Sequence, residues 1–139
     1  MNNLKPLLAS LLVVFVSCSV LRNVWAEDIL AKNRENLNRL SMGMPKSDVL
    51  NIMGTQTIKA YESAQSAQMI VITNPYRTEI MKNEKGESLE VLFYYTDEKR
   101  LGQIADNELT PIVLKDGKVE GWGRSYLMDV VYSYRARLH

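Results

Sequence analysis

Apolar residues recur at helical spacing near the start and at the end of the chain. Over residues 27–41 they lie three and four positions apart with charged residues between them, which predicts an amphipathic helix with one buried face. A shorter helix is predicted over residues 45–54, because proline suits a first helical turn and glycine can close a helix in the left-handed conformation. The spacing over residues 124–138 predicts a last short helix.

In the middle of the chain, apolar residues recur at every second position rather than every three or four. The stretches concerned are rich in β-branched and aromatic residues, and they cover residues 58–61, 69–73, 76–81, 89–95, 109–114 and 118–122. Turn residues separate them, so we expect antiparallel strands. Asp116-Gly117 and residues 84–86 indicate hairpins, and Asn74-Pro75 should bend or end a strand. The pattern predicts an α+β fold with two N-terminal helices packed on a small antiparallel sheet and a short C-terminal helix.

Residues 1–26 have the pattern of a signal peptide for export. Lys5 precedes an uncharged apolar run over residues 6–21, and Ala26 ends a Val-Trp-Ala sequence of the kind that signal peptidase cuts. The run is at the short end of the roughly 17 to 25 residues of a permanent membrane helix. We therefore expect export, with cleavage after Ala26 and a single mature domain over residues 27–139.

A second site of processing competes with Ala26. Residues 14–18 resemble a bacterial lipobox, in which residues 1–17 are removed and Cys18 is acylated to anchor the chain to a membrane. Ser17 before the cysteine favours this alternative, whereas Phe15 stands where such sites usually have leucine. The residues leave a soluble periplasmic form and a lipid-anchored form both open.

Composition excludes several classes of function. The chain has 17 basic and 16 acidic residues and a net charge of +1, so neither nucleic acid nor an anionic membrane surface is an expected partner. Cys18 is the only cysteine, which leaves no pair for a disulfide. The only histidine, His139, is the last residue, and no sequence motif for zinc, phosphate or a nucleophile elbow is present. We expect no catalytic residues, no metal and no cofactor, and hence a protein that is not an enzyme.

Acidic residues cluster in one predicted loop, at Asp97, Glu98, Asp106 and Glu108. Two carboxylates in a cleft can act as general acid and base, but basic residues 99 and 100 are interleaved with these. The spacing does not match an EF-hand calcium loop. The pattern favours a solvated loop of mixed charge.

Aromatic residues are the candidates for binding a partner. If one face of the strand over residues 89–95 is covered by helices, the other face can present Tyr94 or Tyr95 outward. Trp122, between Gly121 and Gly123, is a further candidate anchor, because aromatic residues contribute much of the energy of interfaces. The alternative for Trp122 is a place at the edge of the core, between the sheet and the last helix.

Several segments resemble the BamE (SmpA/OmlA) domain and an uncharacterised bacterial envelope family related to it. A Gly-Met start to a short helix that ends in glycine, over residues 40–54, carries the first resemblance, and residues 74–79, 90–96, 108–113 and 116–123 carry the second. The resemblance implies a two-helix layer on a small antiparallel sheet, as in β-lactamase inhibitor proteins. It also implies an accessory role, and because members are commonly lipoproteins it favours acylation of Cys18. The chain departs from the BamE pattern at Pro45, where a hydroxyl residue usually caps the helix, so we expect capping by Ser47 or water.

Two classes of function follow. The first is a periplasmic or lipid-anchored accessory protein that binds another envelope protein through a sheet face or strand edge, with a role in outer-membrane protein assembly or envelope integrity. The second is a small-ligand-binding or inhibitor module that uses the concave side of the sheet.

Overall fold

The computed structural model describes residues 24–63, 65–82, 86–98 and 104–136. Its elements follow one another as α1 (Ala26–Leu37), α2 (Lys46–Met53), β1 (Thr57–Ser63), β2 (Ser66–Thr73), β3 (Arg77–Lys82), β4 (Ser88–Tyr95), the 3-10 helix η1 (Asp106–Glu108), β5 (Leu109–Lys115), β6 (Lys118–Trp122) and α3 (Arg124–Ala136). All the predicted helices and strands are present, so the α+β fold class is confirmed. The first helix ends at Leu37, earlier than predicted, because the chain turns there and buries Leu40 beside α2.

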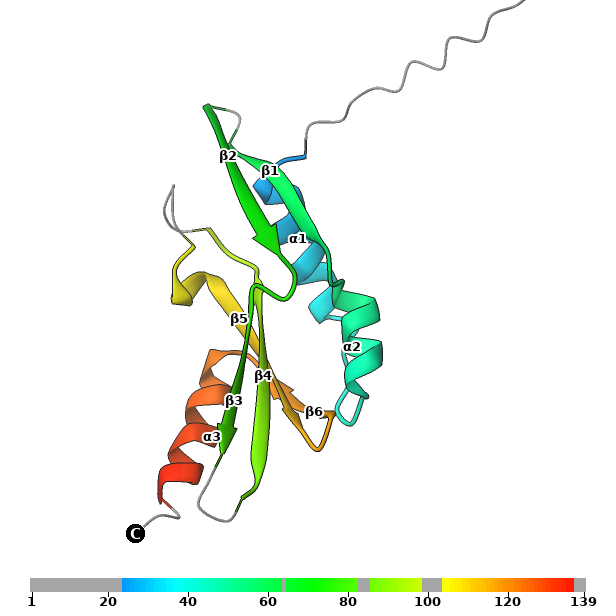
Figure 1. The fold of residues 1–139 in the computed structure, drawn as a ribbon, viewed down its shortest axis with the longest axis vertical. Coiled ribbons are helices and arrows are strands. Elements are labelled where there is room, and N and C mark those ends of the chain that lie inside the picture. The colour runs from blue at the N-terminus through cyan, green and yellow to red at the C-terminus, as the bar shows by residue number, and fades with distance from the viewer. Residues whose placement is uncertain (1–23, 64, 83–85, 99–103, 137–139) are drawn as a thin grey trace, which may run out of the picture.

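The strands form two antiparallel sheets (Figure 1). One consists of β1 and β2, and the other has the order β3-β4-β5-β6. The chain passes from the first sheet to the second at Asn74-Pro75, where the predicted strand break is confirmed. Asn74 directly follows β2, and its N–H donates to Gln56 O, just before β1, at 3.0 Å, whereas the Tyr76 N–H donates to Phe93 O of β4 at 2.7 Å. The turn over residues 74–76 is therefore the joint between the two sheets.

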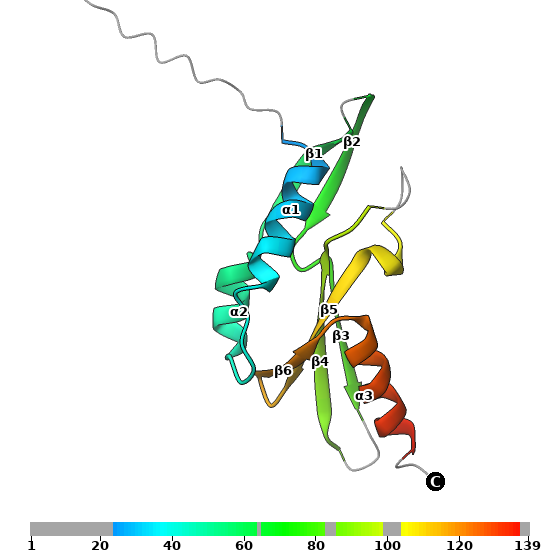
Figure 2. The ribbon, with the colours of Figure 1, turned by 180° about the vertical axis from the view of Figure 1, so that it is seen from behind.

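Helices cover both faces of the four-stranded sheet (Figures 1 and 2). Side chains alternate across β4, so that Leu92 and Tyr94 pack with α2 while Val91 packs with α3. On the α3 side, Gly121 of β6 leaves room for the Tyr126 ring, since a Cβ atom on Gly121 would lie 2.6 Å from that ring. Because neither face of β4 meets water, its last residues form a continuous apolar run rather than an alternating one.

Helix α1 covers the two-stranded sheet and ties it to β4. Ile29 and Leu30 of α1 pack with Ala60 and Ile72 of the β1-β2 hairpin, and Tyr95 at the end of β4 joins the same cluster. The predicted buried face of this helix is confirmed in its first turns.

Distant parts of the chain satisfy both ends of α2. No side chain caps its N-terminus, so the expected cap by Ser47 is wrong; instead the Lys46 N–H donates to Gly117 O of the β5-β6 hairpin at 2.8 Å. At the other end, Met53 O accepts from the Asn74 amide at 3.1 Å, and Gly54 O accepts from the Tyr94 hydroxyl at 3.3 Å. Helix termini leave unpaired backbone groups, and here tertiary contacts pair some of them at each end.

Residues 43–46 run along the outer edge of β6. The Gly43 N–H donates to Val119 O at 2.7 Å, the Val119 N–H donates to Met44 O at 2.8 Å, and Pro45 forms a bridge with Lys118. The adjoining hairpin confirms the Asp-Gly signal, because Asp116 and Gly117 both have positive φ, of 50° and 73°. One edge of the four-stranded sheet is thus closed by the chain itself. The second predicted hairpin, over residues 84–86, lies mostly outside the described residues.

Candidate functional site

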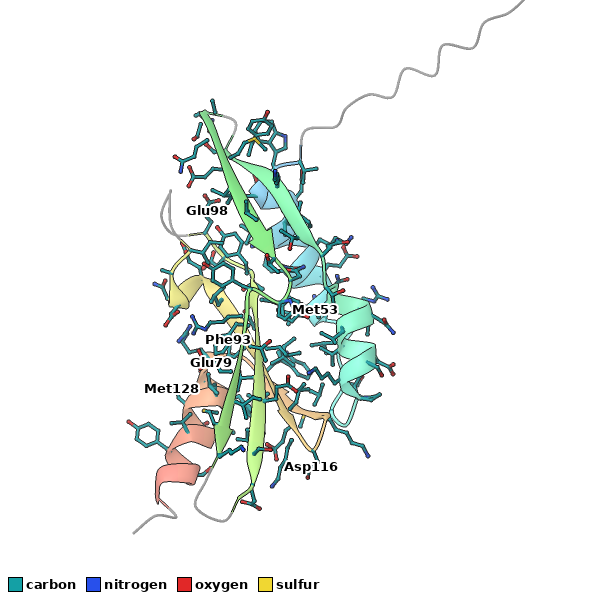
Figure 3. The ribbon with its side chains drawn as sticks, in the orientation of Figure 1. Met53, Glu79, Phe93, Glu98, Asp116 and Met128 are labelled. Carbon is teal, nitrogen blue, oxygen red and sulfur yellow. The ribbon has the colours of Figure 1, made fainter. Side chains whose placement is uncertain are left out.

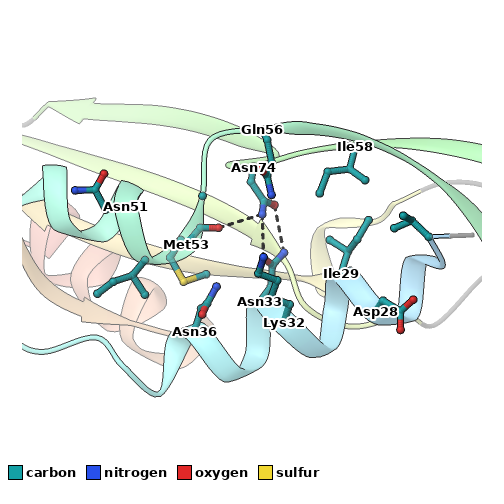
Figure 4. A pocket seen from close by; sticks show the side chains of 13 residues that line it. Asp28, Ile29, Lys32, Asn33, Asn36, Asn51, Met53, Gln56, Ile58 and Asn74 are labelled. Atoms are coloured by element: carbon teal, nitrogen blue, oxygen red, sulfur yellow. Dashed lines mark hydrogen bonds between the residues drawn. The ribbon is translucent and has the colours of Figure 1, made fainter. Parts of the chain in front are cut away.

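A cleft of about 370 Å³ lies between α1 and the segment that leads from α2 into β1 (Figure 4). Ile29, Ile52 and Ile58 supply apolar walls, and Asp28 and Lys32 carry the charges among its lining residues. The remaining polar side chains are neutral amides. They are Asn33, Asn36, Asn51, Gln56 and Asn74.

Two of these amides form a closed pair at the back of the cleft (Figure 4). The Asn33 Nδ2 donates to Asn74 Oδ1 at 3.2 Å, and the Asn74 Nδ2 donates to Asn33 Oδ1 at 3.0 Å. Each Nδ2 has a second acceptor, Tyr95 O for Asn33 at 2.7 Å and Met53 O for Asn74 at 3.1 Å. Both side chains are buried, and every amide hydrogen of the pair has an acceptor. The pair is structural and offers no donor to a ligand.

The other amides retain hydrogen-bonding capacity toward the cleft. Asn36 is 6% exposed; its Oδ1 accepts from Arg39 Nη1 at 3.2 Å, and within the described residues no acceptor takes its Nδ2. Asn51 and Gln56 are exposed at the cleft. Amides do not ionise and each offers both donors and acceptors, which suits binding to peptide groups or small polar molecules rather than acid–base chemistry.

Tyr94 and Tyr95 are both buried, so the expectation that one of them faces outward is wrong. Tyr94 is 0% exposed and Tyr95 is 2% exposed. The prediction assumed that one face of β4 was solvated, whereas α2 covers one face, and α3 with the α1 and β1-β2 unit covers the other. The absence of polar alternation in residues 91–95 is the sequence signal that indicates burial on both faces.

Trp122 is half-buried and packs against the cluster that contains Leu40, Val49 and Ile112. Trp122 therefore lies at the edge of the core, which was the alternative to a role as a partner anchor. It lies on the α2 side of the sheet, however, and not against the last helix as that alternative predicted. Its role in binding a partner stays a prediction.

Ala26 is the first residue of α1 and is 0% exposed, so it belongs to the folded domain. The two residues before it also contact the domain: Val24 O accepts from the Tyr61 N–H at 2.9 Å, and the Trp25 and Tyr61 rings lie 5.5 Å apart between centroids. The Trp25 N–H donates to the Asp28 carboxylate at 3.3 Å. Cys18 and His139 lie outside the described residues.

The acidic residues predicted to share a solvated loop have different environments. Asp97 and Asp106 are exposed, and Asp106 pairs with Arg77 at 2.5 Å between Oδ1 and Nη1, a hydrogen bond that lowers the pKa of that carboxyl. Glu108 is 1% exposed and accepts from the Ala105 N–H at 2.6 Å, so the expectation of a solvated side chain is wrong for this residue. The Arg77 guanidinium also lies 4.2 Å from the centre of the Phe93 ring, at the middle of the molecule in Figure 3.

Glu98 lines a second hollow, of about 370 Å³, at the start of α1 and the end of the β1-β2 hairpin. Glu27, Asp28 and Glu62 also line it. Burial, followed by the neighbouring acids Glu62, Glu108 and Glu27, raises the pKa of Glu98. Across the part of the chain that the structure describes, no group of three or more His, Cys, Asp or Glu side chains is arranged to hold a metal ion.

Residues 10–129 match the model of a family described as "Protein of unknown function (DUF3192)". The chain belongs to the DUF3192 family. Comparison with curated proteins gave no match, and neither did comparison with solved structures. The DUF3192 match spans Cys18, Ala26 and every residue that lines the cleft. The resemblance to the BamE domain stays a prediction.

Replacing Asn33 with leucine should lower the free energy of unfolding by about 1–3 kcal/mol, because Asn74 and Tyr95 O would lose buried hydrogen-bond partners. Urea unfolding followed by circular dichroism measures this loss. Asn38→Leu, at an exposed position just after α1, is the matched control and should change stability by no more than about 0.5 kcal/mol. Equal losses in the two variants would contradict a structural role for the amide pair.

The protein should lose stability as the pH rises above about 10. Burial raises the pKa of the Tyr94 and Tyr95 hydroxyls above the ordinary value of 10.0, with nearby carboxylates adding to the effect at Tyr95. The folded state then keeps protons that the unfolded chain releases, so this stabilisation is complete below the unfolded pKa and is lost above it. Thermal unfolding at a series of alkaline pH values measures the loss. The Tyr94→Phe/Tyr95→Phe variant should show a shallower dependence on pH, and Tyr132→Phe, on an exposed ring, serves as the control.

Proposed function

We propose that this protein is a non-enzymatic accessory protein of the bacterial cell envelope that binds an extended segment of another envelope protein in the amide-lined cleft. The observation that carries the proposal is the lining itself, in which open amides of Asn36, Asn51 and Gln56 lie beside apolar walls. Such amides can pair with peptide N–H and C=O groups, and the apolar walls can take a side chain of the bound segment. The resemblance to envelope accessory domains supports the same class of function.

A lipid anchor at Cys18 is part of this proposal. Cleavage after Ala26 would remove Val24, Trp25 and Ala26, and with them the pairing to Tyr61 and the first residue of α1. Processing before Cys18 keeps all of these contacts and leaves residues 19–23 between the acylated cysteine and the folded domain. The contacts of residues 24–26 therefore favour the lipoprotein alternative over a soluble form that begins at Glu27.

None of the helices in the described part of the chain combines the length and apolar character needed to cross a membrane.

A ligand of low molecular weight is the alternative occupant, since the volume of the cleft, about 370 Å³, lies within the usual range for small-molecule sites. The same amides would then hold the polar groups of that molecule. This alternative keeps the cleft as the functional site and changes only its occupant.

A photo-crosslinking amino acid at Gln56 should give a discrete adduct with another envelope protein when intact cells are irradiated. The matched control carries the same amino acid at Met128 of α3, which lies on the opposite side of the sheet from α2 and its Met53 (Figure 3). Adding Asn51→Arg should lower the yield of the Gln56 adduct at least about tenfold, because a large charged side chain would enter the interface in place of a neutral amide and would have to be desolvated. Equal adducts at Gln56 and Met128 would contradict the proposal, and a small molecule retained by the purified protein, with no adduct, would support the alternative occupant.

The intact mass of the protein isolated from the envelope should correspond to a chain that begins at an acylated Cys18. Replacing Cys18 with serine should prevent this processing, so that the uncleaved precursor accumulates. A mature chain that begins at Glu27 would contradict the lipid anchor, and so would a full-length chain without acylation.

A further inference from the structure

The outer edge of β2 is open. Within the described residues β2 pairs only with β1, on its other side. Open edges are templates for pairing with another chain, and proteins usually protect them with charge, proline or a covering segment. The edge of β6 has such a cover in residues 43–46, whereas none of the described segments pairs with the outer edge of β2.

The pairing of β1 shows which backbone groups of β2 point to this edge. The Tyr61 N–H donates to Val24 O at 2.9 Å, on the side of β1 away from β2. Tyr61 and its register partner Met69 therefore do not exchange hydrogen bonds, and Met69 directs its own N–H and C=O away from β1. Because the pattern alternates along an antiparallel pair, Val71 and Thr73 do the same. These three residues therefore present a row of donors and acceptors with which no other described segment pairs.

The side chains at two of these three positions, Met69 and Val71, are apolar and exposed. Met69 is 53% exposed and Val71 is 55% exposed, on the face of the hairpin opposite to the buried Ile72. Two of the three positions that direct backbone groups to this edge thus also carry an exposed apolar side chain.

The absence of charged residues in β2 makes this strand suited to pair with a second copy of itself. The whole of β2 is Ser-Ala-Gln-Met-Ile-Val-Ile-Thr, without a charged residue or proline. Across a two-fold axis each strand pairs with a copy of itself, so a charge close to the axis would lie near the same charge on the other copy. A neutral strand avoids this repulsion. By contrast, the edge strand β3 carries Arg77, Glu79 and Lys82, which are typical edge-protecting charges.

We propose that β2 is a dimer interface, in which a second copy of this chain adds its own β2 antiparallel across a two-fold axis. The two hairpins then form one continuous sheet of order β1-β2-β2-β1. Val71 of one protomer lies opposite Val71 or Met69 of the other, and the apolar side chains on the outer face of both copies lie side by side. No residue of β2 lines the amide cleft, so the dimer leaves that cleft open.

Opposite charges at Val71 test this interface in the full chain, isolated from the envelope in the form that the cell makes. The wild-type protein should sediment as a dimer in density-matched detergent. Val71→Lys and Val71→Glu, each alone, should weaken the dimer at least about tenfold, because like charges would meet across the axis. An equimolar mixture of the two variants should restore it, which also demonstrates that both variants fold.

Ile80→Lys is the matched control, since Ile80 is an exposed apolar residue on the other open edge strand, β3. It should leave the dimer unchanged, and thermal unfolding should show similar midpoints for all variants. A wild-type monomer at every concentration would overturn the proposal, and so would a Val71 variant that dimerises like the wild type. A wild-type monomer whose β2 edge crosslinks to a different envelope protein would also overturn it. None of these outcomes depends on the occupant of the cleft.

Discussion

The paired amides of Asn33 and Asn74 hold the separate parts of this fold together. Asn33 lies on α1, and Asn74 lies at the joint between the two sheets. Their second hydrogen bonds reach Met53 O at the end of α2 and Tyr95 O at the end of β4. Polar groups this deeply buried are tolerated only when they are fully paired, so the pair defines one arrangement of four segments that sequence places far apart.

That arrangement decides which surfaces are left for function. Leu92 and Tyr94 pack with α2, and Val91 packs with α3, so both faces of β4 are buried within the protein. Residues 43–46 close the edge of β6. Among the surfaces that remain on the described residues are the cleft beside the amide pair and the open strand edges. Our proposals for recognition of another protein therefore rest on neutral amides and strand edges rather than on Tyr94 and Tyr95, which are buried.

The place of residues 24–26 in the fold bears on the proposed lipid anchor at Cys18. The sequence pattern predicts that Trp25 and Ala26 end a signal peptide. In the structure, however, Trp25 pairs with Tyr61 of β1 and Ala26 begins α1. A segment that is part of the folded domain is a poor candidate for removal, because its loss would expose the edge of β1 at Tyr61. This is the physical reason for preferring an anchor at Cys18, which would keep the cleft and the β2 edge close to a membrane.

The sequence by itself determined the helices and strands, the break at Asn74-Pro75 and the Asp116-Gly117 hairpin, because spacing and turn chemistry are local properties. It could not place Tyr94 and Tyr95, since their burial depends on helices that come from opposite ends of the chain. Nor could the sequence reveal the amide cleft. Asn33 and Asn74 are 41 positions apart, and the sequence does not distinguish a solvated asparagine from one that is paired in the core. Only the tertiary structure decided which polar groups are hydrogen-bonded within the fold and which remain exposed, because that depends on long-range packing.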